Sequence, residues 1–492
     1  MKQWLAGVVV LISGFVLVSS AGATVITVDS TVDGFGGTNC SLRNAFISAD
    51  DDNPVGTCPR GDGDDVIRVP QGVYKLTNEG AGERKGITGD LDQILPGSIT
   101  IRPATPGEKV TIDGIGSDRI FDHDEVDAGS LILEDIALIG GSVQGGEGDG
   151  GAIRINFGSV HLDGVTISGS EATRYGGAVA ALGVTNLTMV NSTISGNQSG
   201  ESGGGIHLGP AADGELRSIT VAGNEADSDA DGTGGGGGIS TSADLLLVNS
   251  ILAGNTDASP GPGDSDPDCL SDNHFSPRFV ISSQAIGAGN CLTAPGPVGL
   301  ISPSDPGLGA LADNGGLTST LAIAPGSPAI DAAGSSGSDL CPPTDQRGVI
   351  RPAGSCDLGS FEYDPAGAPA LPLPGIARPT ASTATFDGTN LYVQVSCAKK
   401  FKPKCAMTLT PLTAKKNGKA LGAAVKTTVT SGGRKLVRLP VKASSRGLVE
   451  AMTRVDKRNL VVRQVVKSRK VGKRKPKKPA TSFATFKVRV RI

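Results

Sequence analysis

Apolar positions between residues 131 and 255 recur in a five-fold repeat, in which each copy ends in a turn at or near Gly-Asn. The copies are 27 to 31 residues apart, measured between their turn glycines, which are Gly140, Gly169, Gly196, Gly223 and Gly254. Self-similarity with a period of 20–50 residues is typical of coils stacked into an elongated array. The repeat therefore predicts a solenoid.

Apolar columns emerge when the copies are aligned on the turn glycine. Two positions before it stand Leu138, Ile167, Ile194, Val221 and Leu252. Seven positions before it stand Leu133, Leu162, Met189, Leu216 and Leu247. Within a copy the columns fall at two-residue steps, which indicates strands with one buried face. One coil cannot bury that face alone, whereas stacked coils share a continuous core.

Glycine and small polar residues mark the corners between these strands. Glycine clusters such as Gly150-Gly151 precede a second strand and suit tight corners. The column five positions before the turn is expected to stack as a side-chain ladder and consists of Asp135, Gly164, Asn191, Ser218 and Asn249. The 72 glycines among 492 residues disfavour helices. We predict an all-β fold, a right-handed parallel β-helix.

The N-terminus reads as a secretory signal peptide over residues 1–23. Lys2 precedes an apolar stretch from Leu5 to Val18, and Ala21-Gly22-Ala23 forms a cleavage site. The stretch has 14 residues, whereas a membrane span needs about 20. We expect a mature chain that begins near Thr24, has no transmembrane segment and is secreted or displayed on the cell surface.

The remaining chain divides by composition into five segments. A tract rich in proline separates the solenoid from a last segment whose apolar and polar residues alternate, as in a small antiparallel β-sandwich. The expected segments are an N-terminal cap (24–97), the β-helix (98–300), its C-terminal end region (301–363), the proline-rich linker (364–379) and a basic β-sandwich domain (380–492).

Charge is divided sharply between the solenoid and the last domain. Residues 376–492 hold 29 Lys and Arg against three acids, a net charge of +26, and the rest of the chain has a net charge of −30. The densest basic run comprises Lys467, Arg469, Lys470, Lys473, Arg474, Lys475, Lys477 and Lys478. It predicts salt-dependent binding of anionic polymers without sequence-specific recognition of nucleic acid. Docking on the chain's own acidic body is the alternative.

Eight cysteines suit an exported, disulfide-bonded protein. No Cys-x-x-Cys spacing suggests a zinc site. The cysteines fall in four close pairs along the chain, and we expect local bridges between Cys40 and Cys58, Cys269 and Cys291, Cys341 and Cys356, and Cys397 and Cys405.

One acidic stretch matches the opening of a calcium-binding loop. Asp227, Asp229 and Asp231 precede Gly232 in the pattern D-x-D-x-D-G, which brings carboxylate oxygens to one ion. The glutamate expected at the twelfth position is replaced by Gly238. A solvated acidic loop is therefore the favoured interpretation. We expect no cofactor, and calcium at Asp227, Asp229 and Asp231 is the alternative.

Catalytic residues are not evident in the repeats. Polysaccharide cleavage needs paired carboxylates, or acidic calcium ligands with a base, and we find only scattered candidates. These are Glu134, Asp135, Arg154, His161 and Asp163. Aromatic residues, which form sugar-binding platforms, make up 3% of the chain. We expect binding in preference to catalysis, with no assigned catalytic residue.

Several motifs resemble those of exported bacterial β-helix proteins with a CSLREA-type N-terminal segment and a choice-of-anchor-type end region. The matching segments are Cys40-Ser41-Leu42-Arg43-Asn44-Ala45-Phe46, Gly61-Asp62-Gly63-Asp64-Asp65-Val66-Ile67, Gly72-Val73-Tyr74, Asp313-Asn314-Gly315-Gly316, Pro325-Gly326-Ser327-Pro328-Ala329-Ile330-Asp331, Asp345-Gln346-Arg347-Gly348 and Cys356-Asp357-Leu358-Gly359-Ser360-Phe361-Glu362. Asn44 replaces the usual glutamate, and we expect that position to be structural. The resemblance covers residues 24–363 and implies an extracellular or surface location without a settled activity. The last domain is more loosely similar to basic β-sandwich modules of exported actinobacterial proteins.

Together these observations predict a secreted or cell-surface scaffold or adhesion protein. We expect it to bind extracellular anionic polymers or cell-wall glycan, through the solenoid or through the basic C-terminal domain. The alternative is a polysaccharide lyase or glycoside hydrolase of the pectate-lyase-like β-helix type.

Overall fold

The computed structural model describes residues 23–364, apart from short gaps, and the backbone of seven strands after them. The gaps are 81, 125–128, 146–147, 260–266, 272–274, 285–298, 300, 302–303, 334–340 and 353–355. The described part of the chain is nearly all β-structure, with α1 (Leu42–Asp50) as its one helix.

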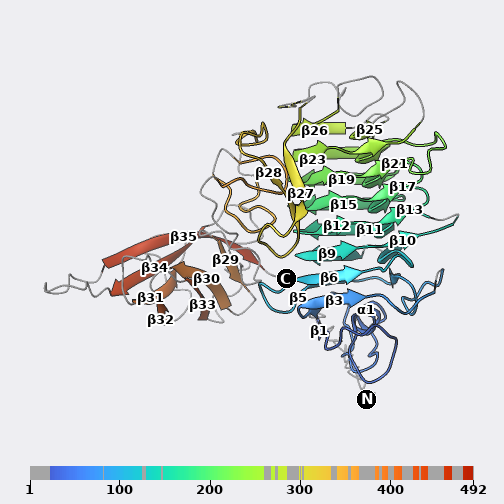
Figure 1. The fold of residues 1–492 in the computed structure, drawn as a ribbon. Helices are drawn as coiled ribbons and strands as arrows, with labels where there is room; N and C mark the ends of the chain where they lie inside the picture. The colour runs from blue at the N-terminus through green and yellow to red at the C-terminus, as the bar shows by residue number, and fades with distance from the viewer. Residues whose placement is uncertain are drawn as a thin grey trace, which may run out of the picture.

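Residues 25–282 form a parallel β-helix, as the repeat predicts (Figure 1). Successive coils add one strand to each of three long rows. The first row runs through β1 (Val25–Thr27), β2 (Asp65–Val69), β5 (Ser98–Pro103), β8 (Ser130–Glu134), the end of β11 (Ile153–Asp163), β15 (Thr185–Val190), β19 (Ala212–Arg217) and the starts of β23 (Asp244–Ala253) and β26 (Phe275–Ser282).

Three further rows of stacked strands form the remaining sides of the coils. The second row contains β3 (Gly72–Lys75), β6 (Val110–Asp113), β9 (Ile136–Ile139), β12 (Thr166–Ser168), β16 (Thr193–Ser195), β20 (Thr220–Ala222) and the ends of β23 and β26. The third contains β4 (Leu91–Gln93), β7 (Phe121–Asp124), the start of β11, β14 (Val179–Ala181), β18 (Ile206–Leu208), β22 (Ile239–Thr241) and β25 (Cys269–Ser271). A short fourth row contains β10 (Ser142–Val143), β13 (Glu171–Ala172), β17 (Gln198–Ser199), β21 (Glu225–Ala226) and β24 (Thr256–Asp257).

The predicted apolar columns form the core. Leu162 lies opposite Met189 in the neighbouring coil, and Leu216 lies opposite Leu247. All four side chains are fully buried and belong to one continuous cluster. The stacking that the repeat predicts is therefore confirmed.

In each coil the chain turns from a first-row strand into the following second-row strand, and the residue at this corner adopts the left-handed backbone conformation that the turn requires. Every member of the column five positions before the turn has a positive φ, namely Asp135, Gly164, Asn191, Ser218 and Asn249. Asparagine, aspartate and glycine tolerate this conformation better than most residues. The small residues of this column are thus explained by backbone geometry.

The hydrogen-bonded ladder that the structure shows follows the turn glycine. The Asn197 amide Nδ2 donates to Asn224 Oδ1 at 2.9 Å, and Asn224 repeats this contact with Asn255 at 2.9 Å. The same acceptor oxygens bind the backbone N–H of the preceding coil. All three side chains are buried, so the ladder satisfies polar groups inside the stack.

Helix α1, which the sequence analysis did not predict, closes the N-terminal end of the stack (Figure 1). Ser41 is its N-cap and accepts a hydrogen bond from the Asn44 N–H. The Asn44 side chain bonds the backbone of Gly36 and Asn39. Asn44 is therefore structural, as expected. Strands β1 to β4 already belong to the stack, so the first coils are built within the segment expected as a cap.

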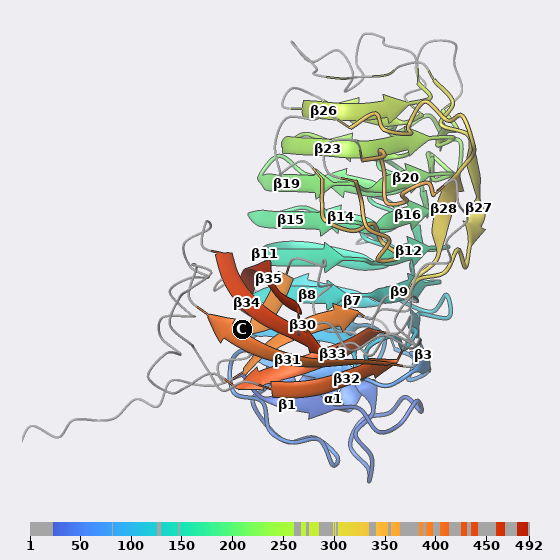
Figure 2. The same ribbon diagram turned by 90° about the vertical axis from the view of Figure 1, so that its left-hand side faces the viewer.

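The end region returns along the outside of the β-helix, over the second row (Figures 1 and 2). It contains the antiparallel pair β27 (Leu308–Ala312) and β28 (Thr320–Ile323). Gln346 and Ser360 bond buried threonines of the second row, and Leu358 packs in an apolar cluster with Ile251. The end region is thus a cover for one face of the solenoid.

The described strands of the last segment form one seven-stranded sheet in the order β32-β31-β34-β35-β29-β30-β33. Their pairs are antiparallel except β29 with β35, which is parallel. The sandwich arrangement stays a prediction. The strands are β29 (Thr383–Phe386), β30 (Asn390–Ser396), β31 (Lys404–Leu412), β32 (Val425–Thr430), β33 (Arg434–Pro440), β34 (Asn459–Lys467) and β35 (Ala480–Val490).

Candidate functional site

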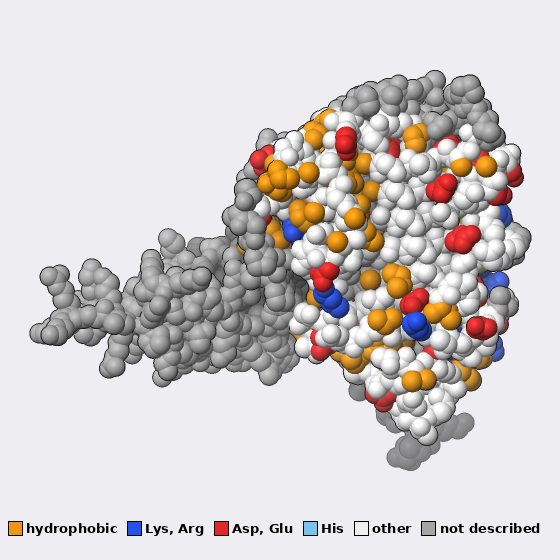
Figure 3. Space-filling model, in the orientation of Figure 1, with side chains coloured by type: hydrophobic (Ala, Val, Ile, Leu, Met, Phe, Trp, Pro, Cys, Tyr) orange, Lys and Arg blue, Asp and Glu red, His pale blue; other side chains and the backbone are white. Residues whose placement is uncertain are grey.

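The three long rows of the β-helix differ in how far their outer faces are open to solvent. On the second row the outward column Thr166, Thr193 and Thr220 is buried beneath the end region. Hydrophobic side chains gather on the surface where Figure 1 places β27 and β28 (Figure 3). Most of the outward column of the third row is also buried, including Asp122 and Arg154, while His207 and Leu270 are partly exposed. Among the described residues, the first row has the open outer face.

A groove with a volume of about 450 Å³ crosses this open face over β15, β19, β23 and β26. Figure 2 shows these strands stacked above one another. The groove is lined by Asn186, Leu187, Thr188, Asp213, Gly214, Glu215, Asp244, Leu245, Leu246, Ser276 and Arg278. The lining therefore combines leucines with polar side chains, most of which carry oxygen atoms that can accept hydrogen bonds.

The strand register explains this lining. Because side chains alternate between the two faces of a strand, residues beside the buried leucines point outward. Asn186, Asp213 and Asp244 are register partners in successive coils. A parallel outward column contains Thr188, Glu215, Leu246 and Ser276. The groove is therefore built from repeated positions, each supplied once per coil.

Charge in the groove is mainly negative. Asp213 and Asp244 lie directly opposite each other on neighbouring strands and are both exposed. Like charges in this arrangement are destabilising. Glu215 is paired with Arg217 on its own strand, and Arg278 lies opposite Val248, in the next outward column. The groove thus offers more carboxylates than cations.

The third row holds a second group of acids, which is buried. Arg154 Nε donates to Asp122 Oδ1 at 2.9 Å, and Arg119 donates to Asp122 Oδ2 at 3.0 Å. Carboxylate oxygens of Asp90, Asp92 and Asp122 lie within 4.8 Å of one another. Burial raises the pKa of Asp92 to about 7 and that of Asp90 well above its ordinary value. Because arginines occupy both oxygens of Asp122, we interpret the group as a structural ion network.

The five scattered catalytic candidates are not brought together. His161 lies opposite Thr188, one coil before the groove. Glu134 binds Arg102 at 3.2 Å, and Arg154 belongs to the buried network of another row. Asp135 is a corner residue, and Asp163 ends β11. These contacts give no nucleophile and base at one position.

The predicted calcium loop has a compact geometry. Asp227, Asp229 and Asp231 bring carboxylate oxygens within 4.8 Å of one another. Asp227 is fully buried, and its Oδ1 accepts from the Asp231 N–H at 3.0 Å. The Asp231 Oδ1 accepts from Thr233. The carboxylates therefore also stabilise the loop itself, and calcium binding stays a prediction.

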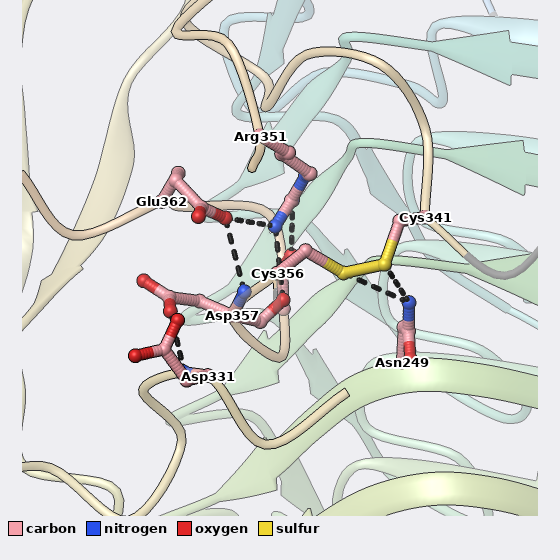
Figure 4. Close-up of a disulfide and its surroundings, with 8 residues drawn as sticks. Asn249, Asp331, Cys341, Arg351, Cys356, Asp357 and Glu362 are labelled. Carbon is pink, nitrogen blue, oxygen red and sulfur yellow. Dashed lines mark hydrogen bonds and ion pairs between the residues drawn. A yellow bond between two sulfur atoms is a disulfide. The ribbon is translucent and has the colours of Figure 1, made fainter. Parts of the chain in front are cut away.

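Two of the predicted disulfides are present. Cys40 is bonded to Cys58 in the cap, and Cys341 is bonded to Cys356 in the end region. Figure 4 shows the second bridge beside Asn249, whose Nδ2 lies 3.5 Å from either sulfur. The other two predicted pairs involve Cys291 and Cys397, which lie outside the described residues.

Lys467 is the last residue of β34. The other residues of the predicted polyanion site lie outside the described part of the chain, namely Arg469, Lys470, Lys473, Arg474, Lys475, Lys477 and Lys478. No helix within the described residues has the length and apolar character needed to span a bilayer.

The sequence analysis missed the carboxylates of the groove, although the repeat contains their signal. Ten positions before the turn glycine stand Asn186, Asp213 and Asp244, and eight positions before it stand Thr188 and Glu215. These outward columns alternate with the apolar columns used to predict the fold. A search for polar columns would have found the groove.

Comparison with known proteins adds no assignment: the chain matches no model of a known protein family and no curated protein.

Proposed function

We propose that this protein is a secreted or cell-surface scaffold that binds an extended extracellular polymer along the first row of its β-helix. The observation that supports this most is the open groove over β15, β19, β23 and β26. On the second row the threonines from β12 to β20 are buried beneath the end region, and most of the outward column of the third row is buried as well, so the first-row face is left for a ligand.

A polymer suits the groove because both are repetitive. Neighbouring strands lie about 4.8 Å apart, so a groove over four coils extends roughly 14 Å along the solenoid. Each coil contributes a hydrogen-bonding side chain at an equivalent position, as Asn186 and Asp213 do. A chain of regularly spaced sugars could therefore make the same contact at each coil.

Binding of purified mature protein to a polysaccharide panel, followed by affinity electrophoresis and calorimetry, tests this function. Asn186 is exposed on the groove face, so Asn186→Trp should fill the groove without disturbing the core. We expect this variant to bind at least tenfold more weakly than the parent protein. Asn53→Trp, on an exposed loop of the cap, is the control. Equal binding by both variants would contradict a site on the first row.

Polysaccharide cleavage is the second candidate function, because Asp213, Glu215 and Asp244 place three carboxylates in one groove. Hydrolysis requires two carboxyl groups flanking the scissile bond. Release of reducing ends or unsaturated products from a bound polymer would support an enzyme, provided that Asp213→Asn or Glu215→Gln abolishes it. Binding without turnover would leave the scaffold function.

The basic C-terminal domain provides a second proposed attachment, to anionic extracellular polymers. The support is its net charge of +26 over residues 376–492.

We further infer a right-handed solenoid, a C-terminal sandwich and membership of the exported β-helix proteins that the motifs resemble. Export is supported by the disulfides, which persist in oxidising compartments.

Salt titration of binding to heparin and to DNA tests the second attachment. Counterion release predicts a steep fall in affinity for both polymers between 50 and about 200 mM salt. Salt-independent binding, or no binding at low salt, would contradict an electrostatic role for the basic domain.

A further inference from the structure

We propose that residues 82–90 form a pH-sensitive strap at the first strands of the third row. The strap is closed while the carboxyl cluster beside it retains protons, and it opens more often as rising pH removes them. This carboxyl cluster consists of Asp90, at the end of the strap, with Asp92, Asp118 and Asp122. The inference is independent of the proposed polymer binding, because the cluster and the groove lie on different rows.

The strap is fastened to two strands through their carboxyl groups. The Gly86 N–H donates to Asp92 Oδ2 on β4 at 2.8 Å, and Arg84 forms an ion pair with Asp124 on β7. Both contacts depend on an acid, so the charge state of the carboxyls decides how well the strap is held.

The carboxyl cluster gathers more acids than bases in a buried place. Its four side chains are each 7% exposed or less, and carboxylate oxygens of Asp90, Asp92 and Asp122 lie within 4.8 Å of one another. Two buried guanidiniums pair with them. Arg119 lies 3.4 Å from Asp90 and 3.0 Å from Asp122, and Arg154 also pairs with Asp122. Ionisation of all four carboxyls would therefore bury two more negative than positive charges, which is costly.

The charged groups around the cluster do not remove this excess. Most of them form pairs of their own, which are Arg43 with Asp33, Arg84 with Asp124, and Arg174 with Asp149. On the strap, Glu83 adds an acid that disfavours ionisation of Asp92, and Lys85 is exposed. Asp50 on α1 adds another acid, which accepts from the Ile94 N–H. His123 is fully buried, and burial lowers its pKa to about 4, so it carries no charge near neutral pH.

Protons remove the excess instead, and the pKa shifts have the direction that this requires. Burial raises the pKa of Asp92 to about 7, that of Asp90 well above its ordinary value, and that of Asp118 as well. When the strap opens, water reaches these carboxyls and their pKa values return towards the ordinary 3.8. Between about pH 4 and pH 7 the closed state thus holds protons that the open state has lost, so rising pH favours opening.

The Arg43 guanidinium opposes this opening. It donates to the backbone oxygens of Gly86, Gly89 and Asp90, which do not titrate. Because this resistance is the same at every pH, a pH change alters how often the strap opens without detaching it. Hydrogen exchange detects such rare local openings.

Hydrogen–deuterium exchange of the mature protein at pH 5 and pH 8, in EDTA, tests the strap. After correction for the intrinsic exchange rate, we expect protection of residues 82–93 to fall at least tenfold between the two pH values, relative to residues 185–226. The fall should be smaller in Asp92→Asn and in Asp90→Asn, because an amide cannot ionise. Glu171→Gln removes an exposed acid of the fourth row and should behave like the parent protein.

Four results would overturn the strap. The first is unchanged protection of residues 82–93 between the two pH values, and the second is an equal fall in all coils, which would mean global unfolding. The third is a full fall in both asparagine variants, which would place the titrating groups elsewhere. The fourth is recovery of protection at pH 8 when a divalent cation replaces EDTA, which would assign a metal ion to the carboxyls.

Discussion

At the scale of single residues, Arg43 shows how a charge can be placed inside this fold. Its side chain is 0% exposed, pairs with Asp33 at 2.8 Å and donates to the backbone oxygens of Gly86, Gly89 and Asp90. A buried cation is tolerated only when its donors are satisfied. Arg43 therefore joins helix α1 to the loops before β4.

Replacing Arg43 by alanine should destabilise the cap strongly. Asp33 would remain buried without its partner, which costs about 3–5 kcal/mol. Urea unfolding followed by fluorescence or circular dichroism measures the loss. Lys109→Ala, which removes an exposed ion pair with Asp313, is the control and should cost about 1 kcal/mol or less. Similar losses for both variants would contradict the role assigned to Arg43.

Asp92 should make stability fall as pH rises. Burial raises its pKa to about 7 from an unfolded value of 3.8, so between these values the folded state retains a proton that the unfolded state has lost. This stabilisation is complete below about pH 4 and disappears as pH rises through 7. His123, whose pKa burial lowers to about 4, acts in the opposite direction below its unfolded value.

The comparison of Asp92→Asn with the parent protein isolates this effect, because the contribution of His123 is common to both. The difference in unfolding free energy between pH 5 and pH 8 should be smaller in the variant. Chemical unfolding at the two pH values provides the measurement. An identical pH dependence for both proteins would show that Asp92 does not titrate in this range.

At the scale of elements, the asparagine ladder stabilises the corners that follow the turn glycines. Asn224 contacts Asn197 and Asn255 and donates to the Ile194 carbonyl oxygen at 3.1 Å. Asn224→Ala would leave buried groups on both neighbouring coils without partners, at about 1–3 kcal/mol. Thermal unfolding measures the loss, and Asn53→Ala on the exposed cap loop should be neutral. A neutral Asn224→Ala would show that the ladder contributes little.

The end region depends on the bridge between Cys341 and Cys356. A bridge that closes a loop of about 15 residues stabilises by roughly 3 kcal/mol in the chain-entropy description, and the two cysteines are 15 residues apart. In the double variant C341S/C356S, proteolysis should begin within residues 304–364, while the solenoid core stays protected. Cleavage at the same rate as in the parent protein would contradict this fastening role.

Glu362 supports the same element through Arg351, which binds it at 2.9 Å, and through the backbone N–H of Asp357 (Figure 4). Burial raises the pKa of Glu362 to about 7. The end region therefore combines a covalent bridge with a buried ion pair.

The coils could be predicted from the sequence because each repeats the same two-residue alternation, so Leu162 and Met189 identify the core by position alone. The cover that the end region forms over the second row could not be predicted in this way. Its contacts join side chains far apart in the chain, such as Gln346 and Thr193 at a separation of 153 residues. Helix α1 was missed because it occurs once, although the Ser41 cap was a local signal for it.

At the scale of the whole molecule, one long face of the β-helix is open among the described residues, and contacts within the chain cover much of the other two. The end region covers the second row, and a buried ion network fills part of the third. The first row repeats polar positions from coil to coil without a cover. With the electrostatic attachment that we propose for the basic last domain, the protein would join two extracellular polymers.

A crystal structure of the mature protein with a bound oligosaccharide, chosen from the polysaccharide that it binds in solution, tests the central claim most directly. We predict a sugar chain that lies in the groove over β15, β19, β23 and β26 and contacts Asn186 and Asp213. A ligand bound to another row, or an empty groove in crystals of a protein that binds the same oligosaccharide in solution, would contradict it.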